Sequence, residues 1–320
     1  MSSIKLFQIT ILVLSVNLFV VSGCAQESKN TEELTYVSNT MDYLTSDELE
    51  GRKAGTEGYQ KAVEYVEKEF KSKGLNPYFE SYRDVFDAKG NETYNVVAYL
   101  EGTDKTLAKE LVIIGAHLDH IGTGKITNGD EIANGANDNA SGSTAVLALA
   151  EHFAGLKANK RSILFVLFGA EEMGLLGSDH LAKRLKEKNV DVYTMINFEM
   201  IGVPLNDKAY MAYLTGYELS NMADKINEYS GEEIIGYLPK AKEYQLFKRS
   251  DNYAFYKEYK IPAQTISTFD FTNYDYYHHV DDEAEYMNYE FMEELIHKMK
   301  TPLLEIANSD QKEIVMKDNQ

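Results

Sequence analysis

Short apolar segments alternate along the chain with segments of helical periodicity, and this alternation limits the folds open to it. The apolar segments predict buried β-strands at Asn95–Leu100, Leu111–Ala116, Ile163–Phe168, Val192–Phe198, Ala209–Leu214 and Ile261–Ile266. Amphipathic patterns predict helices at residues 56–73, Ser143–Leu156, Leu176–Lys188, Glu218–Tyr229 and Tyr289–Ala307. Because no repeat or Gly/Pro-rich linker divides the chain, we predict an α/β fold, a single domain with a central, mostly parallel mixed β-sheet flanked by helices.

The composition and charge exclude several functional classes. Of the 320 residues, 44% are hydrophobic and 26% charged, a balance typical of a folded globular protein and not of a disordered one. The formal net charge is −19, and no stripe of Lys and Arg offsets it, so the surface repels phosphate backbones. We therefore expect no nucleic-acid partner, and nothing in the sequence indicates an obligate protein partner.

The first 23 residues have the pattern of a secretory signal. Lys5 supplies a positive charge, and the apolar run from Ile9 to Val21 is too short for a convincing membrane span. The run ends in Val-Ser-Gly before Cys24, the only cysteine of the chain, and this ending resembles the lipobox of bacterial lipoproteins. The resemblance implies export and a membrane anchor on a lipidated Cys24, at a periplasmic face or the cell surface. The alternative is a generic signal followed by a free thiol.

Side chains that bind metals follow several of the predicted strands, at the sheet edge where α/β folds bind ligands. They are His117 and Asp119 after the second strand, Glu171 and Glu172 after the third, Glu199 after the fourth, and the pair His278-His279 late in the chain. His117 and Asp119 point to the same side of an extended segment, so the imidazole could bind a metal while the carboxylate orients it. Each motif alone has a simpler explanation, such as a polar strand end or a helix start. Their joint occurrence in this order favours a metal centre.

The order of six motifs resembles the zinc aminopeptidases of family M28. The motifs are AHLDHIG, NGANDNASG, GAEEMGLLGS, NFEMIG, SDNYAF and YHHVDD. The resemblance runs from Leu49-Glu50-Gly51-Arg52 to the C-terminal helix, so it covers nearly all of the chain after the signal. It implies a zinc-exopeptidase-like fold and a metallopeptidase domain over 35–309. With the N-terminal pattern, the predicted organisation is a signal peptide over 1–23, a tether over 24–34, this domain, and a polar tail over 310–320.

The resemblance also implies a centre of two zinc ions. Asp138 would bridge them, His117 and Glu199 would complete one ion, and Glu172 and His278 would complete the other. All of these ligands are nitrogen or oxygen donors, which suit hydrolytic zinc. Many family members have aspartate in place of Glu199.

The same resemblance implies the roles of the remaining site residues. Glu171 would be the general base that takes a proton from water and then delivers it to the leaving amine. Asp119 would orient His117, and the Asp138–Asn139 peptide bond would be cis. His279 is the alternative to His278, which we prefer because its spacing to Asp282 fits the family pattern. His120 follows the family pattern without an assigned ligand role.

The function predicted from these features is an exported, membrane-anchored, zinc-dependent aminopeptidase that acts on peptides. One alternative is a glutaminyl cyclase, whose single zinc would use Asp138, Glu172 and His278. A second is a carboxypeptidase or dipeptidase on a similar scaffold, and a third is a lipoprotein that keeps the fold for binding and has lost catalysis. The presence of His117 and Glu199 favours two metals.

Overall fold

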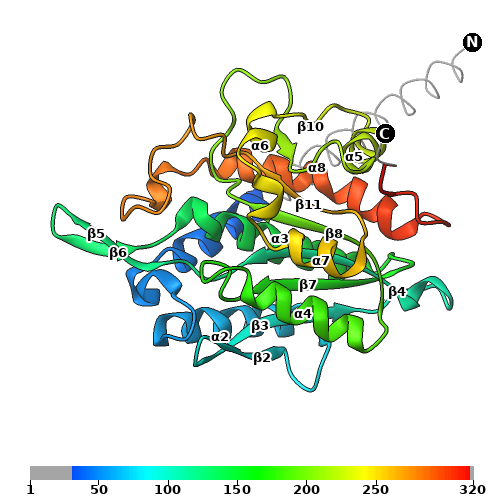
Figure 1. Ribbon diagram of the computed structural model, residues 1–320, viewed down its shortest axis with the longest axis horizontal. Coiled ribbons are helices and arrows are strands. Elements are labelled where there is room, and N and C mark those ends of the chain that lie inside the picture. Colours follow the sequence, from blue (N-terminus) through cyan, green and yellow to red (C-terminus); the bar gives the residue numbers. More distant parts are fainter. Residues whose placement is uncertain (1–30, 318–320) are drawn as a thin grey trace, which may run out of the picture.

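A nine-stranded sheet organises the computed structural model, which describes residues 31–317. The path through the sheet is β1-β3-β7-β4-β8-β11-β9-β10, and β2 also pairs with β3 (Figure 1). The four central strands are mutually parallel: β7 (Ser162–Phe168), β4 (Glu110–His117), β8 (Asp191–Glu199) and β11 (Ala263–Ser267). The flanking strands are β1 (Asn76–Pro77), β2 (Arg83–Ala88), β3 (Asn91–Leu100), β9 (Ala212–Leu214) and β10 (Ile235–Gly236). Antiparallel pairs join the parallel central strands to both edges, so the predicted mixed sheet is confirmed.

Helices cover both faces of the sheet, and the alternation of side chains along each strand explains why. In β4, Val112 and Ile114 enter the larger apolar core, whereas Leu111 and Ile113 enter the smaller one. The larger core receives α2 (Glu57–Ser72), α3 (Gly142–Leu156), α5 (Met222–Ser230) and α8 (Tyr289–Asn308). The smaller core receives α4 (Leu176–Glu187) and α7 (Asn252–Tyr259). Strands buried on both sides read as continuous apolar runs, which is the pattern seen in the sequence.

Short elements complete the described part of the chain. They are the helical turns η1 (Asp47–Arg52), η2 (Leu107–Lys109), η3 (Ala136–Ser141), η4 (Leu246–Lys248) and η5 (Ala284–Tyr286), together with α6 (Pro239–Glu243). A separate hairpin of β5 (Gly122–Thr127) and β6 (Asp130–Ala133) projects from the body of the molecule (Figure 1). The hairpin, η1 and α7 were not predicted, because their sequences lack a clear period. The predicted strand at Ala209–Leu214 begins only at Ala212.

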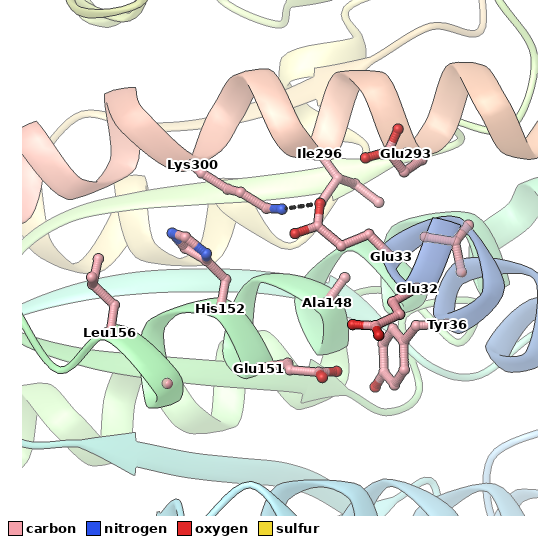
Figure 2. A pocket seen from close by; sticks show the side chains of 12 residues that line it. Glu32, Glu33, Tyr36, Ala148, Glu151, His152, Leu156, Glu293, Ile296 and Lys300 are labelled. Atoms are coloured by element: carbon pink, nitrogen blue, oxygen red, sulfur yellow. Dashed lines mark hydrogen bonds and ion pairs between the residues drawn. The ribbon is translucent and has the colours of Figure 1, made fainter. Parts of the chain in front are cut away.

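A helix begins ahead of residue 35, the predicted start of the domain. The chain is already helical over residues 31–44, so the last residues of the predicted tether belong to a helix. Glu33 on this helix accepts a hydrogen bond of 2.5 Å from Lys300 of α8 (Figure 2). Val37 and Met41 on the same helix are buried in the larger core. The polar residues at its start therefore gave no sign of a helix, which packs on the domain through the contacts of Glu33 and an apolar face.

The predicted polar tail also packs against the domain where the structure describes it. Ile314 is 2% exposed, and its main-chain N–H donates a hydrogen bond of 2.7 Å to Tyr193 Oη. Met316 forms a β-bridge with Ser220. The segment after α8 thus lies against the start of β8 and the start of α5.

The signal peptide and Cys24 lie outside the described residues, so their assignment stays a prediction. Within residues 31–317, none of the helices has the length and apolar character needed to cross a membrane.

Candidate active site

The carboxyl ends of the central strands bring the predicted site residues to one edge of the sheet. His117 is the last residue of β4, and Glu199 is the last residue of β8, its parallel neighbour. On the other side of β4, β7 ends at Phe168 beside His117 and leads directly into Glu171 and Glu172. Side chains separated by 82 positions in the sequence, such as His117 and Glu199, therefore meet at hydrogen-bond distance.

The loop that carries Asp138 is held by side chains from other elements. Asp282 accepts the N–H of Asn137 at 2.8 Å with one carboxylate oxygen and the N–H of Asp138 at 3.0 Å with the other. Tyr274 Oη donates to Asp282 at 2.7 Å. The Asn139 amide donates to the carbonyl of Phe198 at 2.9 Å, which ties the loop to β8. The Asp138–Asn139 peptide bond is cis, as expected.

Asp138 lies between two clusters of metal-ligand side chains. On one side, His117 Nε2 lies 3.3 Å from Asp138 Oδ1 and 3.1 Å from Glu199 Oε1. On the other side, His278 Nε2 lies 3.3 Å from Asp138 Oδ2 and 3.1 Å from Glu172 Oε2. Each oxygen of the Asp138 carboxylate thus faces its own imidazole and its own glutamate. This is the arrangement that a bridging carboxylate between two cations requires.

The donor set fits zinc. Four ligands at about 2.0–2.1 Å from a tetrahedral zinc lie roughly 3.3–3.4 Å from one another, close to the separations of 3.1–3.3 Å in both clusters. Each cluster offers two carboxylate groups and an imidazole, a catalytic set that leaves a coordination position open. A second imidazole, that of His120, also lies within ligand reach of Asp138 and Glu172. His117 and Asp138 are fully or almost fully buried, and buried carboxylates gathered in this way need cations to compensate them.

The family model for peptidase family M28 matches residues 95–301, which include every residue of both clusters. The chain belongs to peptidase family M28. Leupeptin-inactivating enzyme 1 of Streptomyces exfoliatus is 33% identical over 165 residues, which are 51% of this chain and 33% of that protein. The chain thus spans about a third of the length of this curated relative.

Solved structures share the fold of this M28 chain at low sequence identity. The LapA aminopeptidase of Legionella pneumophila is 21% identical with a TM-score of 0.67, over 89% of this chain and 76% of that one. Glutaminyl cyclase of Fimbriiglobus ruber is 18% identical with a TM-score of 0.65, over 86% of this chain and 94% of that one. At these identities the likeness establishes the fold, which is therefore the zinc-exopeptidase-like fold that the motifs imply.

Glu171 follows β7 in the M28 site and directly precedes Glu172 in the chain. Burial raises the pKa of its carboxyl well above the usual value, although the nearby His117 opposes this shift. The carboxylates of Glu199 and Asp251 raise the pKa further because they disfavour another negative charge close by. A raised pKa makes the ionised carboxylate a stronger base than an ordinary glutamate, which suits it to take a proton from water and pass it on.

The role predicted for Asp119 is only partly what the M28 structure shows. His117 Nδ1 lies 3.0 Å from the main-chain oxygen of Asp119, whereas the Asp119 carboxylate is 3.9 Å away. The main chain is therefore the closer partner of the imidazole. The carboxylate instead accepts the N–H groups of Glu171 at 3.0 Å and Glu172 at 3.3 Å. It positions the two glutamates, a function that the H-x-D spacing does not reveal.

Of the two late histidines, His278 is the one that the structure brings to the M28 site. His279 Nδ1 instead accepts the N–H of Asp281 at 3.1 Å, and its ring packs against Tyr276. The spacing argument that favoured His278 agrees with this geometry.

Two further residues of the M28 site had no assigned role in the sequence. Ser250 donates a short hydrogen bond to Glu199 Oε2, and this bond orients the carboxylate whose other oxygen faces His117. His120 Nδ1 lies 3.0 Å from Glu172 Oε1. The motif SDNYAF pointed to Ser250, but its contact with a glutamate 51 residues away could not be read from it.

A small pocket of about 60 Å³ opens beside Glu199. Its apolar wall is formed by Met200, Tyr213, Leu246, Phe269, Phe271 and Tyr277. A pocket of this size beside the M28 centre can receive one side chain of a substrate.

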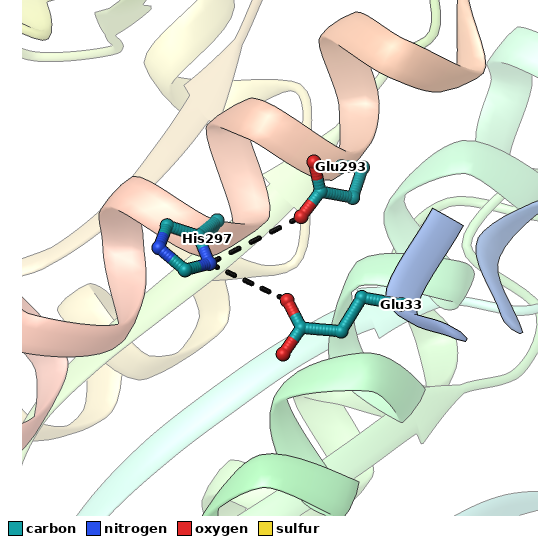
Figure 3. Close-up of side chains that lie close together, drawn as sticks. All are labelled: Glu33, Glu293 and His297. Carbon is teal, nitrogen blue, oxygen red and sulfur yellow. Dashed lines mark hydrogen bonds and ion pairs between the residues drawn. The ribbon is translucent and has the colours of Figure 1, made fainter. Parts of the chain in front are cut away.

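A third group of possible ligands lies away from the M28 site, where Glu33 and His297 meet across two helices (Figure 3). His297 Nδ1 is 3.3 Å from Glu33 Oε2 and 4.0 Å from Glu293 Oε1. Lys300 donates to the same Glu33 oxygen. The lysine ammonium already supplies the positive charge here, so we assign no metal to this group.

The carboxyl of Glu283 near the Asp138 loop gives a pH-dependent prediction. Burial raises its pKa to about 7, opposed by a 2.9 Å hydrogen bond from Asn134 and reinforced by the carboxylate of Asp47. Because the folded state binds this proton more tightly than the unfolded state, the stabilisation is present at low pH and is lost as the pH rises through about 7. We expect Glu283→Gln, which cannot ionise, to raise the Tm by about 2–4 °C at pH 8 and by less at pH 5.

Thermal unfolding at both pH values checks this expectation. Glu285→Gln, at an exposed position on the neighbouring turn, is the matched control and should give the same small change at both. An equal effect of Glu283→Gln at pH 5 and pH 8 would contradict the assignment.

Proposed function

We propose that this M28 protein is an exported, lipid-anchored aminopeptidase that uses two zinc ions to remove N-terminal residues from peptides. The observation that carries the proposal is the Asp138 carboxylate, whose two oxygens each face a separate imidazole and glutamate. The aminopeptidase name of the LapA neighbour supports the activity. The signal and Cys24 in the sequence support export and anchoring.

His117, Asp138 and Glu199 would hold one ion, and Asp138, Glu172 and His278 would hold the other. Bound zinc polarises a carbonyl and lowers the pKa of a water molecule. Glu171 takes a proton from the attacking water on its carboxylate and delivers it to the nitrogen of the departing amine. The pocket beside Glu199 receives the side chain of the N-terminal residue.

A single-zinc glutaminyl cyclase is the second candidate, supported by the fold it shares with the Fimbriiglobus ruber enzyme. That activity would need only Asp138, Glu172 and His278. The cluster of His117 and Glu199, in hydrogen-bond contact and oriented by Ser250, favours the two-metal aminopeptidase.

Metal content and product analysis test the proposal. We expect the purified protein to contain two zinc ions and to release free amino acids from short peptides. Prolonged chelation should abolish release, and added zinc should restore it, because the open clusters lose their ions without unfolding the sheet. Pyroglutamate formation from glutaminyl peptides with one bound zinc would move the function to the cyclase. A protein that binds no zinc and cleaves no peptide would support the inactive binding alternative.

A further inference from the structure

His120 is a fully buried imidazole beside the cluster of Glu172 and His278. It is 1% exposed, and its Nδ1 lies 3.0 Å from Glu172 Oε1. The other oxygen of the same carboxylate, Oε2, lies 3.1 Å from His278 Nε2. The two oxygens of Glu172 are thus divided between two histidines. His120 Nδ1 is 3.8 Å from Asp138 Oδ2, farther than His278 Nε2 at 3.3 Å.

The surroundings of the other ring nitrogen indicate where His120 carries its proton. Nε2 is buried and has no hydrogen-bond partner among residues 31–317. Leaving a buried N–H without an acceptor costs free energy, and native structures tolerate it less readily than an unused acceptor. Of the two ring nitrogens, Nδ1 is therefore the one whose N–H has an acceptor, because Glu172 Oε1 lies 3.0 Å from it.

The packing around His120 fixes the ring in this orientation. Gly135 has φ +59°, and a Cβ at that position would lie 2.5 Å from His120 Cγ, so only glycine leaves room for the ring. The main-chain N–H of His120 donates a hydrogen bond to the carbonyl of Arg52 at 3.3 Å, which holds the backbone that carries the ring. The ring meets His278 edge to face with centroids 5.7 Å apart.

We propose that His120 is a positioning residue for the second metal cluster, and that it acts by donating Nδ1–H to Glu172 Oε1. This donation holds the carboxylate so that Oε2 faces His278 and Asp138. Direct ligation through Nδ1 would move the proton to Nε2, where no acceptor lies within reach among the described residues. The inference rests on the proposed function for the presence of zinc at this cluster. It assigns a role to the second histidine of AHLDHIG, which otherwise has none.

Zinc titration of the metal-free protein, with a competing chelator, tests the proposal without using activity. Outer-shell hydrogen bonds to metal ligands typically contribute 10–100-fold to metal affinity. We expect His120→Ala to weaken one of two zinc sites by about 10–100-fold. His120→Asn should bind within about threefold of the wild type, because the Asn amide nitrogen occupies the position of Nδ1. His120→Gln, which places its amide one atom farther out, should resemble the alanine variant.

The outcomes separate positioning from ligation and from a merely structural role. If His120 were a ligand, His120→Asn would lose as much affinity as His120→Ala, and the proposal would be overturned. Unchanged zinc affinity in His120→Ala would also overturn it. His297→Ala, a change at an exposed histidine of α8, is the control and should leave both zinc affinities unchanged. Two bound zinc ions without peptide cleavage would count against the proposed function and leave the role of His120 standing.

Discussion

The Glu171→Gln variant should lose peptide hydrolysis by about 10²–10⁴-fold in kcat while it keeps its zinc. Glutamine preserves the size of the side chain but can neither accept a proton from water nor return one to the amine. Glu172 and Glu199 each lie at hydrogen-bond distance from an imidazole, but Glu171 does not in the described part of the chain. Its replacement should therefore leave the ligand clusters undisturbed. The measurement is kcat for a short peptide together with zinc content of the same preparation.

Two companion variants make this result specific. Glu172→Gln changes the adjacent glutamate, which contacts His278 and His120, and should lower zinc binding together with activity. Glu187→Gln, at an exposed position at the end of α4, should leave both unchanged. Full activity of Glu171→Gln would remove Glu171 from the proposed chemistry, and loss of zinc in that variant would assign it a structural role instead.

The predicted centre of the fold rests on a strong physical signal. Strands β4 and β7 are buried on both faces, so their sequences are continuous apolar runs that end where the sheet ends. The carboxyl ends of parallel strands lie at the same edge of a sheet, so the strand pattern alone predicts that His117, Glu172 and Glu199 lie at one edge. The choice of His278 came from the family spacing and not from periodicity.

Other parts of the site depend on contacts that leave no local pattern. Asp282 holds the Asp138 loop by accepting main-chain N–H groups 144 and 145 residues away. Almost every residue has a main-chain N–H, so the sequence carries no pattern that shows which side chain will accept it. The contacts of the Asp119 carboxylate could not be predicted for the same reason, because it accepts the main-chain N–H groups of Glu171 and Glu172.

Arg52 is the strongest example of a buried residue that supports the site from outside it. It is 0% exposed, and its guanidinium donates to the carbonyls of Leu118 at 2.9 Å, Asn134 at 2.6 Å and Gly135 at 3.0 Å. It also donates to the carbonyl of Leu44. One side chain therefore joins the 31–44 helix, the segment after β4 and the loop before Asp138.

The charge of Arg52 matters as well as its hydrogen bonds. Burial lowers the pKa of the guanidinium to about 10, and the carboxylates of Asp282 and Asp138 oppose this shift. The group therefore stays protonated at neutral pH and offsets part of the negative charge around the metal clusters. Its removal would leave buried carbonyls unpaired and carboxylates less compensated, two costs that act in the same direction.

We expect Arg52→Met to destabilise the protein by about 3–5 kcal/mol, the range for breaking a buried charged network, and to lower the Tm by roughly 6–20 °C. Arg52→Lys should fall between this variant and the wild type, because it keeps the charge but has three donors in place of five. Lys53→Met, the exposed neighbour, should change stability by less than about 0.5 kcal/mol. Thermal unfolding of the metal-free proteins measures the effect independently of zinc. A Tm of Arg52→Met within 2 °C of the wild type would show that the four carbonyls find other partners and that the guanidinium does not hold these segments together.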